Sequence, residues 1–279
     1  MVKNYKLISL LIFFGQRFFF VRGALRKLLI SSIHHLINFD HSKDPIESRV
    51  STVVDGVPFF FYFDGMSETK QILGSYNKKE IDFIKNNTDE NSIFIDIGAN
   101  IGFYTQNISA TFNNTKLSKI IAIEPNPVLV KRIEDNIKLL EINIPNIKDR
   151  VIIENCAVGS SIDNVYLDLN EGYGNARVKN TKSTTSIPIK MLSLLEIIKK
   201  NKIEYITNLK IDVEGYEDKA LKPFFENAPS KLFPQNIVIE YTSQSEWEDK
   251  KFIKYLLEKG YKEIIKTRGN LCLSLDITT

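Results

Sequence analysis

The sequence predicts an α/β fold: a doubly wound, mostly parallel sheet with a C-terminal antiparallel hairpin and an N-terminal helical and hairpin extension. Three observations carry this prediction. An apolar run that starts at residue 93 is closed by Asp96 and a turn with two glycines, as in a buried parallel strand that leads into a helix. Further strand-like runs alternate with helical segments, the pattern of a sheet covered by helices on both faces. The last two β-prone runs, 261–266 and 271–277, are joined by a turn that contains Gly269 and predict a hairpin.

Residues 1–75 are predicted to form the extension. The segment 5–37 is expected to be helical, and it is rich in Phe, Leu and Ile with interspersed Lys and Arg. Its apolar run over 7–15 is too short to span a bilayer. The segment is therefore expected to pack on the domain, on a second copy in a homodimer, or on a membrane surface as a peripheral contact. Residues 51–64 predict a β-hairpin, because Asp55-Gly56 separates two β-prone runs.

Residues 76–279 are predicted to form the main domain. A short helix over 78–86 leads into the first core strand, and a second is expected over 101–112. Asn126 can cap a helix that opens with Pro127, a favoured first position. Helices are also expected over 191–201 and 247–260, the latter closed by Gly260. The expected parallel strands are 93–97, 119–124, 151–158, 206–212 and 237–241, with β-prone additions at 163–169 and 186–189.

Two of these strands end in acids beside one glycine turn, which indicates a nucleotide-type cofactor. A dinucleotide fingerprint needs Gly-x-Gly-x-x-Gly to approach a pyrophosphate, whereas this chain has Asp96-x-Gly98-x-x-x-Gly102. An acid there suits an ammonium better than a phosphate, and Glu124 could take both hydroxyls of a ribose. S-adenosylmethionine carries an ammonium, a sulfonium and a ribose. An ordinary turn capped by Asn100 and a nicotinamide cofactor are the alternatives.

The chain resembles the FkbM-type family of S-adenosylmethionine-dependent methyltransferases. Four blocks carry the resemblance and run in the family's order: Ile95-Asp96-Ile97-Gly98-Ala99-Asn100-Ile101-Gly102, Ile123-Glu124-Pro125-Asn126-Pro127, Asn155-Cys156-Ala157-Val158-Gly159 and Lys210-Ile211-Asp212-Val213-Glu214-Gly215. The resemblance implies a Rossmann-like class I fold with a seven-stranded sheet. One departure is visible, because Met191-Leu192-Ser193 stands where the family usually has Thr-Leu-Asp.

The cofactor-binding residues follow from these blocks. We assign Asp96, Gly98 and Asn100, with the Gly102 end of the turn, to the methionine moiety, and Glu124 to the ribose. Asn126 is expected to be a helix cap first and a cofactor neighbour second. The resemblance implies that Asn155 and Ala157 lie beside the adenine. Asp212, at the end of the fourth parallel strand, is expected to lie near the transferred methyl group.

Three carboxylates are candidates for catalysis. A hydroxyl acceptor needs a base, and Asp212 and Glu214 follow the fourth parallel strand, with Glu240 at the end of the fifth. Aromatic residues near the expected cleft, Tyr173, Tyr216, Tyr241 and Trp247, could stack on a sugar. No metal site is expected.

The leading functional hypothesis is O-methylation of a hydroxyl on a sugar, glycan or glycolipid precursor. The alternatives are a polyketide or other secondary-metabolite hydroxyl, a nicotinamide-dependent oxidoreductase, or a cofactor-binding module without catalysis. A net charge of +3 gives no argument for a nucleic-acid partner. The two cysteines, Cys156 and Cys272, lack metal-ligand spacing and are expected to be buried thiols of a cytoplasmic protein.

Overall fold

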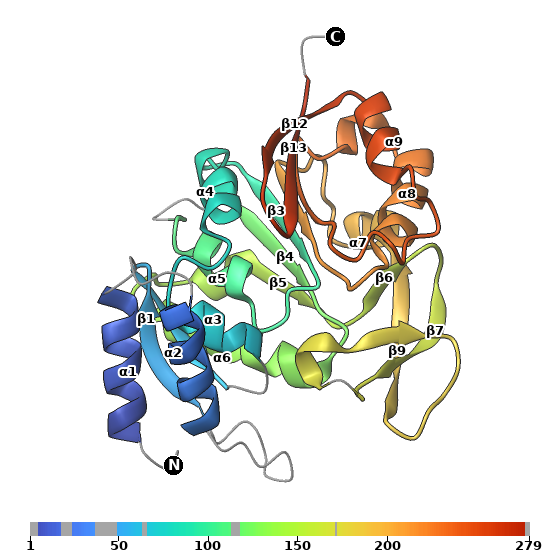
Figure 1. Cartoon of the computed structure of the whole chain (residues 1–279). Helices are drawn as coiled ribbons and strands as arrows, with labels where there is room; N and C mark the ends of the chain where they lie inside the picture. The colour runs from blue at the N-terminus through green and yellow to red at the C-terminus, as the bar shows by residue number, and fades with distance from the viewer. Residues whose placement is uncertain are drawn as a thin grey trace.

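A computed structural model of the chain describes residues 5–17, 24–36, 49–62, 66–112, 118–170 and 172–276. Its centre is a seven-stranded sheet in the order β12-β13-β11-β10-β3-β4-β5 (Figure 1). These strands are β3 (Ile93–Ile97), β4 (Lys119–Ile123), β5 (Val151–Glu154), β10 (Asn208–Ile211), β11 (Asn236–Glu240), β12 (Tyr261–Lys266) and β13 (Asn270–Leu275). The first five run parallel, and the last two form an antiparallel hairpin against β11. The predicted doubly wound sheet with its closing hairpin is confirmed.

Helices cover both faces of this sheet. One layer contains α4 (Lys78–Asn86), α5 (Phe103–Ser109) and α6 (Pro127–Glu141), and the other contains α7 (Leu194–Lys200), α8 (Glu217–Asn227) and α9 (Phe252–Glu258). Side chains of β3 alternate between the layers, so that Phe94 joins the first apolar core and Ile95 joins the second. Burial on both faces explains why this strand is apolar at every position except Asp96.

The extension contains α1 (Tyr5–Arg17), α2 (Ala24–Leu36), the hairpin β1 (Val50–Val54) and β2 (Val57–Phe61), and α3 (Met66–Ile72). The single helical segment expected over 5–37 is described as two helices, and its residues 18–23 and 37 lie outside the described residues. The expected hairpin over 51–64 is described as far as residue 62. The ring of Phe59 stacks on Phe103 with centroids 5.1 Å apart, and the Phe60 amide donates to Asn136 Oδ1 at 2.7 Å. The extension and the main domain therefore share one apolar core, while the boundary at residue 75 stays a prediction. No helix within the described ranges is long and apolar enough to cross a membrane.

A second sheet of four strands stands beside the main one (Figure 1). Its order is β6 (Ala157–Gly159), β9 (Ser186–Ser193), β7 (Asp163–Asp168) and β8 (Arg177–Lys179). The single strand expected over 151–158 is therefore wrong, because β5 ends at Glu154 and β6 belongs to the second sheet. Asn155 Nδ2 donates to the carbonyls of Glu124 and Pro125, both at 2.9 Å. These bonds hold the chain where it leaves the main sheet.

Three helix predictions need correction. The helix expected over 191–201 begins only at Leu194, because Met191 to Ser193 pair within β9. Ser193 then caps α7 through a capping box with Glu196, a role in which serine and aspartate serve equally well. The helix expected over 247–260 is the shorter α9. Residues 217–227 were assigned no helix, yet the parallel pair β10 and β11 requires a crossover, and α8 supplies it.

Candidate active site

The turn between β3 and α5 forms one wall of a cavity. Gly98 has a φ of +71°, and a Cβ placed there would collide with the carbonyl oxygen of Asp212. Glycine therefore lets β3 turn this close to β10. The amides of Gly98 and Ala99 both donate to the Ile123 carbonyl, at 3.0 and 3.1 Å, which holds the turn against the end of β4.

Glu124 follows β4 and faces this turn. Its Oε2 accepts a hydrogen bond from the Asn100 amide at 2.8 Å, and its Oε1 accepts one from the Asn126 amide at 2.9 Å. Burial raises the pKa of Glu124 to about 7, against the lowering effect of these two hydrogen bonds. A carboxylate offers about four acceptor positions, so each oxygen can still accept a hydroxyl donor.

The cavity lies at the carboxyl ends of β3, β4 and β10. Six of the residues assigned from the sequence line it: Gly98, Asn100, Glu124, Ala157, Asp212 and Glu214. The other five lie in the described part of the chain but outside this lining: Asp96, Gly102, Asn126, Asn155 and Glu240. The turn, the ribose-type acid and two candidate bases thus meet in one cavity.

Asp96 lies beneath the turn. It is fully buried, and its Oδ2 accepts from the amide of Thr105 at 3.1 Å and from its hydroxyl at 2.7 Å. These bonds fix the first turn of α5 on the end of β3. The expected contact between Asp96 and a ligand ammonium stays a prediction, and the geometry gives this carboxylate a structural role as well.

Lys210 was not singled out by the sequence analysis. Its Nζ donates to the Gly98 carbonyl at 2.8 Å and lies 3.5 Å from Asp96 Oδ1 and 4.0 Å from Asp212 Oδ2. The side chain is buried and lines the cavity. A lysine between the apolar residues Leu209 and Ile211 of the buried strand β10 was the signal that could have revealed it. It connects the glycine turn to the carboxylates after β10.

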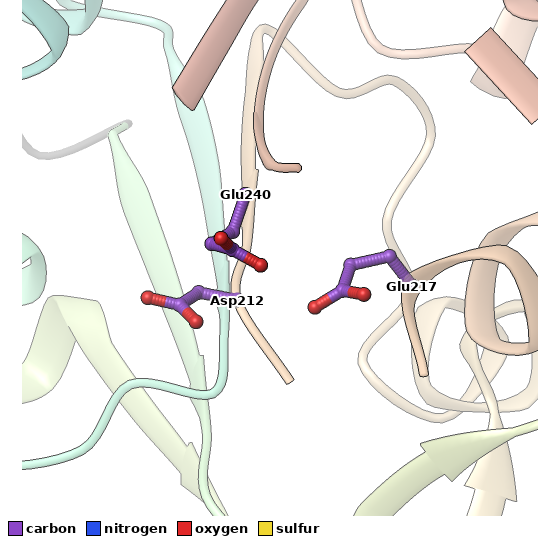
Figure 2. Close-up of side chains that lie close together, drawn as sticks. All are labelled: Asp212, Glu217 and Glu240. Atoms are coloured by element: carbon purple, nitrogen blue, oxygen red, sulfur yellow. The ribbon is translucent and has the colours of Figure 1, made fainter. Parts of the chain in front are cut away.

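An acidic cluster lies where β10 and β11 end and α8 begins (Figure 2). Asp212, Glu217 and Glu240 offer carboxylate oxygens that all lie within 4.8 Å of one another. Glu217 was missed by the sequence analysis, because it belongs to the unassigned helix α8. Its Oε1 accepts from the Val213 amide at 2.9 Å and its Oε2 from Trp247 Nε1 at 2.6 Å. The spacing is short enough for a shared cation, so the expectation of no metal stays a prediction.

Glu214 lines the cavity next to this cluster. It adopts a φ of +55°, a left-handed conformation that is unusual for a glutamate. Burial, followed by the nearby charges of Asp212 and Glu240, raises its pKa to about 7. A carboxylate with this pKa can accept a proton near neutral pH.

Three of the remaining assigned residues hold the local backbone. Asn126 Oδ1 accepts from the Val128 amide at 3.0 Å, which confirms that it caps α6. Asn155 fixes the Glu124-Pro125 turn, as described above. Glu240 Oε1 accepts from the Thr242 amide at 2.6 Å, so this oxygen is engaged in the turn after β11.

Aromatic side chains supply much of the remaining cavity wall. Tyr173 and Tyr216 line it as expected, whereas Tyr241 donates to the Thr267 carbonyl at 2.7 Å and Trp247 is buried against Glu217. The sequence analysis did not identify three further lining residues: Tyr76, Phe103 and Tyr104.

The segment 172–177 connects both walls of the site. The carbonyl of Tyr173 accepts from Asn126 Nδ2 at 3.3 Å, on the side of α6. Arg177 pairs with Glu246 at 2.6 Å, on the side of the loop after β11. We call this segment the strap.

Both cysteines are buried and free, as predicted. Burial raises the pKa of each thiol to about 12, so neither forms a thiolate near neutral pH.

Residues 96–263 match the family model of the methyltransferase FkbM domain. No curated protein matches the chain. A solved structure of a methyltransferase FkbM from Methylobacillus flagellatus KT is similar, with 16% identity over 75% of this chain and 52% of that chain and a TM-score of 0.47. The chain thus spans about half the length of that protein. TYW2 from M. jannaschii in complex with AdoMet is 17% identical over 81% of this chain and 85% of that chain, with a TM-score of 0.39. A methyltransferase from Geobacter sulfurreducens is 11% identical over 72% of this chain and 78% of that chain, with a TM-score of 0.44.

Proposed function

The chain belongs to the FkbM family of S-adenosylmethionine-dependent methyltransferases, and from this premise we propose that it methylates a hydroxyl group on a sugar, glycan or glycolipid precursor. Family membership removes the support for a nicotinamide-dependent oxidoreductase. The observation that carries the proposal is that Glu214, a carboxylate with a pKa near 7, lines the same cavity as the glycine turn and Glu124.

The cavity fits S-adenosylmethionine by the chemistry of its walls. The turn at Gly98 has no room for a side chain, and Glu124 keeps acceptor capacity on both carboxylate oxygens for two ribose hydroxyls. Ala157 and Cys156 give an apolar lining that suits an adenine. The bound cofactor supplies a methyl group on an electrophilic sulfonium.

The chain's own contribution is positioning and proton removal. A sugar hydroxyl is a poor nucleophile at neutral pH, and Glu214 takes its proton at a carboxylate oxygen as the methyl group is transferred. Burial is the main cause of the raised pKa of Glu214, and like-charge repulsion from the neighbouring Asp212 raises it further. Lys210 keeps the glycine turn and the acidic segment in register.

The acceptor class is proposed from the aromatic part of the wall. Tyr76, Tyr173 and Tyr216 combine flat faces with hydroxyl groups, and Asn77 adds an amide. Sugars bind to such surfaces by stacking and hydrogen bonding. Hydroxyls of polyketides are the runner-up, because an apolar acceptor would use the same aromatic faces.

The proposal is tested by binding and by turnover. Titration calorimetry should show tight adenosylhomocysteine binding and no binding of NAD. Incubation of the protein with labelled S-adenosylmethionine and a panel of saccharides, lipid-linked saccharides and polyketide alcohols should transfer label to a saccharide hydroxyl. Transfer only to polyketide alcohols contradicts the glycan assignment. Cofactor binding with no transfer to any panel member favours a module without catalysis.

A further inference from the structure

Helix α1 exposes an apolar stripe on its outward side. Leu10, Phe13 and Phe14 are 49%, 48% and 44% exposed, and Arg17 continues the same row. The spacing of these four residues is i, i+3, i+4 and i+7, which places them on one helix face. Helices at a protein surface ordinarily turn polar side chains to the solvent.

The opposite side of α1 is firmly docked. Ile12 is buried, and Gly15 lies against the side chain of Leu73. Gln16 Nε2 donates to the carbonyls of Val53 at 3.0 Å and Ile72 at 2.8 Å. These contacts fix which side of α1 faces the protein, and they therefore leave Leu10, Phe13 and Phe14 on the side that faces the solvent.

Helix α2 packs beside α1 at the edge of the molecule (Figure 1) and also carries exposed side chains. Leu28 is 63% exposed, and Lys27 beside it is exposed as well. We name the group Leu10, Phe13, Phe14, Arg17, Lys27 and Leu28 the outer face.

The N-terminal part of the sequence is uniformly basic. The first acidic residue of the chain is Asp40, and the preceding segment carries only basic charges: Lys3, Lys6, Arg17, Arg22, Arg26 and Lys27. The Arg17 guanidinium lies 4.6 Å from the centroid of the Phe13 ring. Aromatic rings with adjacent cations suit the boundary between acyl chains and anionic headgroups.

We propose that the outer face docks on an anionic lipid surface, with α1 lying in the plane of the interface. A second copy of the chain is the competing occupant. In a two-fold interface the outer face of one copy would contact the outer face of the other. Arg17 and Lys27 of one copy would then lie near Arg17 and Lys27 of the other, and residues 1–39 offer no acidic partner for them. The charge pattern therefore favours lipid. This inference does not depend on the identity of the methyl acceptor.

Co-sedimentation of the full chain with vesicles tests the proposal. The protein should sediment with vesicles of phosphatidylcholine and phosphatidylglycerol, bind pure phosphatidylcholine weakly, and dissociate as salt is raised. The double variant Phe13→Ser, Phe14→Ser should lose binding at least about tenfold, because two apolar side chains no longer enter the interface. The matched control Leu257→Ser, Ile264→Ser changes two side chains that are 42% and 53% exposed elsewhere, and should bind like the wild type.

Charge-reversal variants measure the electrostatic contribution to vesicle binding. Arg17→Glu with Lys27→Glu should abolish the preference for phosphatidylglycerol. Thermal unfolding checks that each variant is folded. The proposal is overturned if the wild type does not bind anionic vesicles, or if the serine pair binds them as well as its control. It is also overturned if light scattering shows a dimer that the serine pair dissociates, since the outer face would then be covered by a second copy.

Discussion

Glu124 is the residue on which the cofactor assignment most directly depends. Glu124→Ala removes two charge-assisted hydrogen bonds to the ribose, each of about 1.5 to 3 kcal/mol, and should weaken adenosylhomocysteine binding at least tenfold by calorimetry. Glu154→Ala is the matched control, because Glu154 is equally buried at the end of the neighbouring strand β5 but does not line the cavity. Unchanged affinity in a folded Glu124→Ala protein contradicts the ribose assignment.

Glu214 gives the reaction its expected pH dependence. The base must be deprotonated, and its pKa is raised to about 7, so turnover should rise as the pH increases through about 7. Glu214→Gln keeps the size of the side chain but removes its basicity, and should lower turnover roughly 10²-fold while cofactor affinity changes little. Steady-state rates across the pH range measure both effects.

Two further variants locate the base if Glu214 is not it. Asp212→Asn and Glu240→Gln change the neighbouring carboxylates, of which only Asp212 lines the cavity. Full activity of Glu214→Gln together with loss in Asp212→Asn moves the role to Asp212.

The acidic cluster of Asp212, Glu217 and Glu240 is where a divalent metal would bind if methyl transfer needed one, so the expectation of no metal can be tested there. Two of the cluster's carboxylates already accept hydrogen bonds from the chain, including the Trp247 indole and the Thr242 amide. We therefore expect methyl transfer to continue after treatment with a chelator and to be unaffected by added Mg²⁺. Loss of activity with restoration by Mg²⁺ or Mn²⁺ means that these carboxylates are metal ligands.

The sequence identified the residues of the cavity that belong to glycine turns and strand ends. It missed Lys210, whose role depends on reaching the Gly98 carbonyl in the turn after the neighbouring strand β3. It also missed Glu217 and Tyr76, which reach the site from a helix and a connecting loop that no local pattern linked to it. Which carboxylates face the cavity depends on side-chain direction at the strand ends, and that is set by tertiary packing.

At the scale of the element, the turn after β3 should tolerate no side chain at its first glycine. Gly98→Ala combines an unfavourable φ with a collision against the Asp212 carbonyl. It should therefore lower the free energy of unfolding by clearly more than the cost of placing alanine at a positive φ. It should also abolish cofactor binding. Gly56→Ala is the control, because Gly56 has a φ of +86° with nothing within 4 Å. It should cost only about 1 to 2 kcal/mol. Denaturant unfolding measures both, and equal losses contradict the collision.

The elements that the sequence predicted best are those with a strong local pattern. The core strands are mostly apolar and buried, and α6 has its cap and proline at the expected positions. The errors lie where tertiary contacts override the pattern. The run over 151–158 has β-prone residues at both of its ends and was predicted as one strand, yet Asn155 redirects it between two sheets. Helix α8 contains Pro223, which obscures a helical pattern that packing against the sheet nevertheless stabilises.

At the scale of the whole molecule, the extension is expected to be inseparable from the main domain. Removal of residues 1–75 would uncover Phe103 and the face of α6 that now contacts β2. Such a protein should aggregate and lose its cooperative thermal transition. Light scattering and calorimetry are the measurements, and a monomeric truncated protein with cooperative unfolding shows that the two parts fold separately.

The strap also bears on the timing of the catalytic cycle. One end of the strap is fixed to the start of α6 by the hydrogen bond from Asn126 to Tyr173, and the other end is fixed to the loop after β11 by the ion pair of Arg177 with Glu246. Moving the strap away from the cavity therefore means breaking one or both of these contacts. A spent cofactor held beneath it would have a residence time governed by those contacts. Departure of the by-product from the cavity would then require those contacts to break.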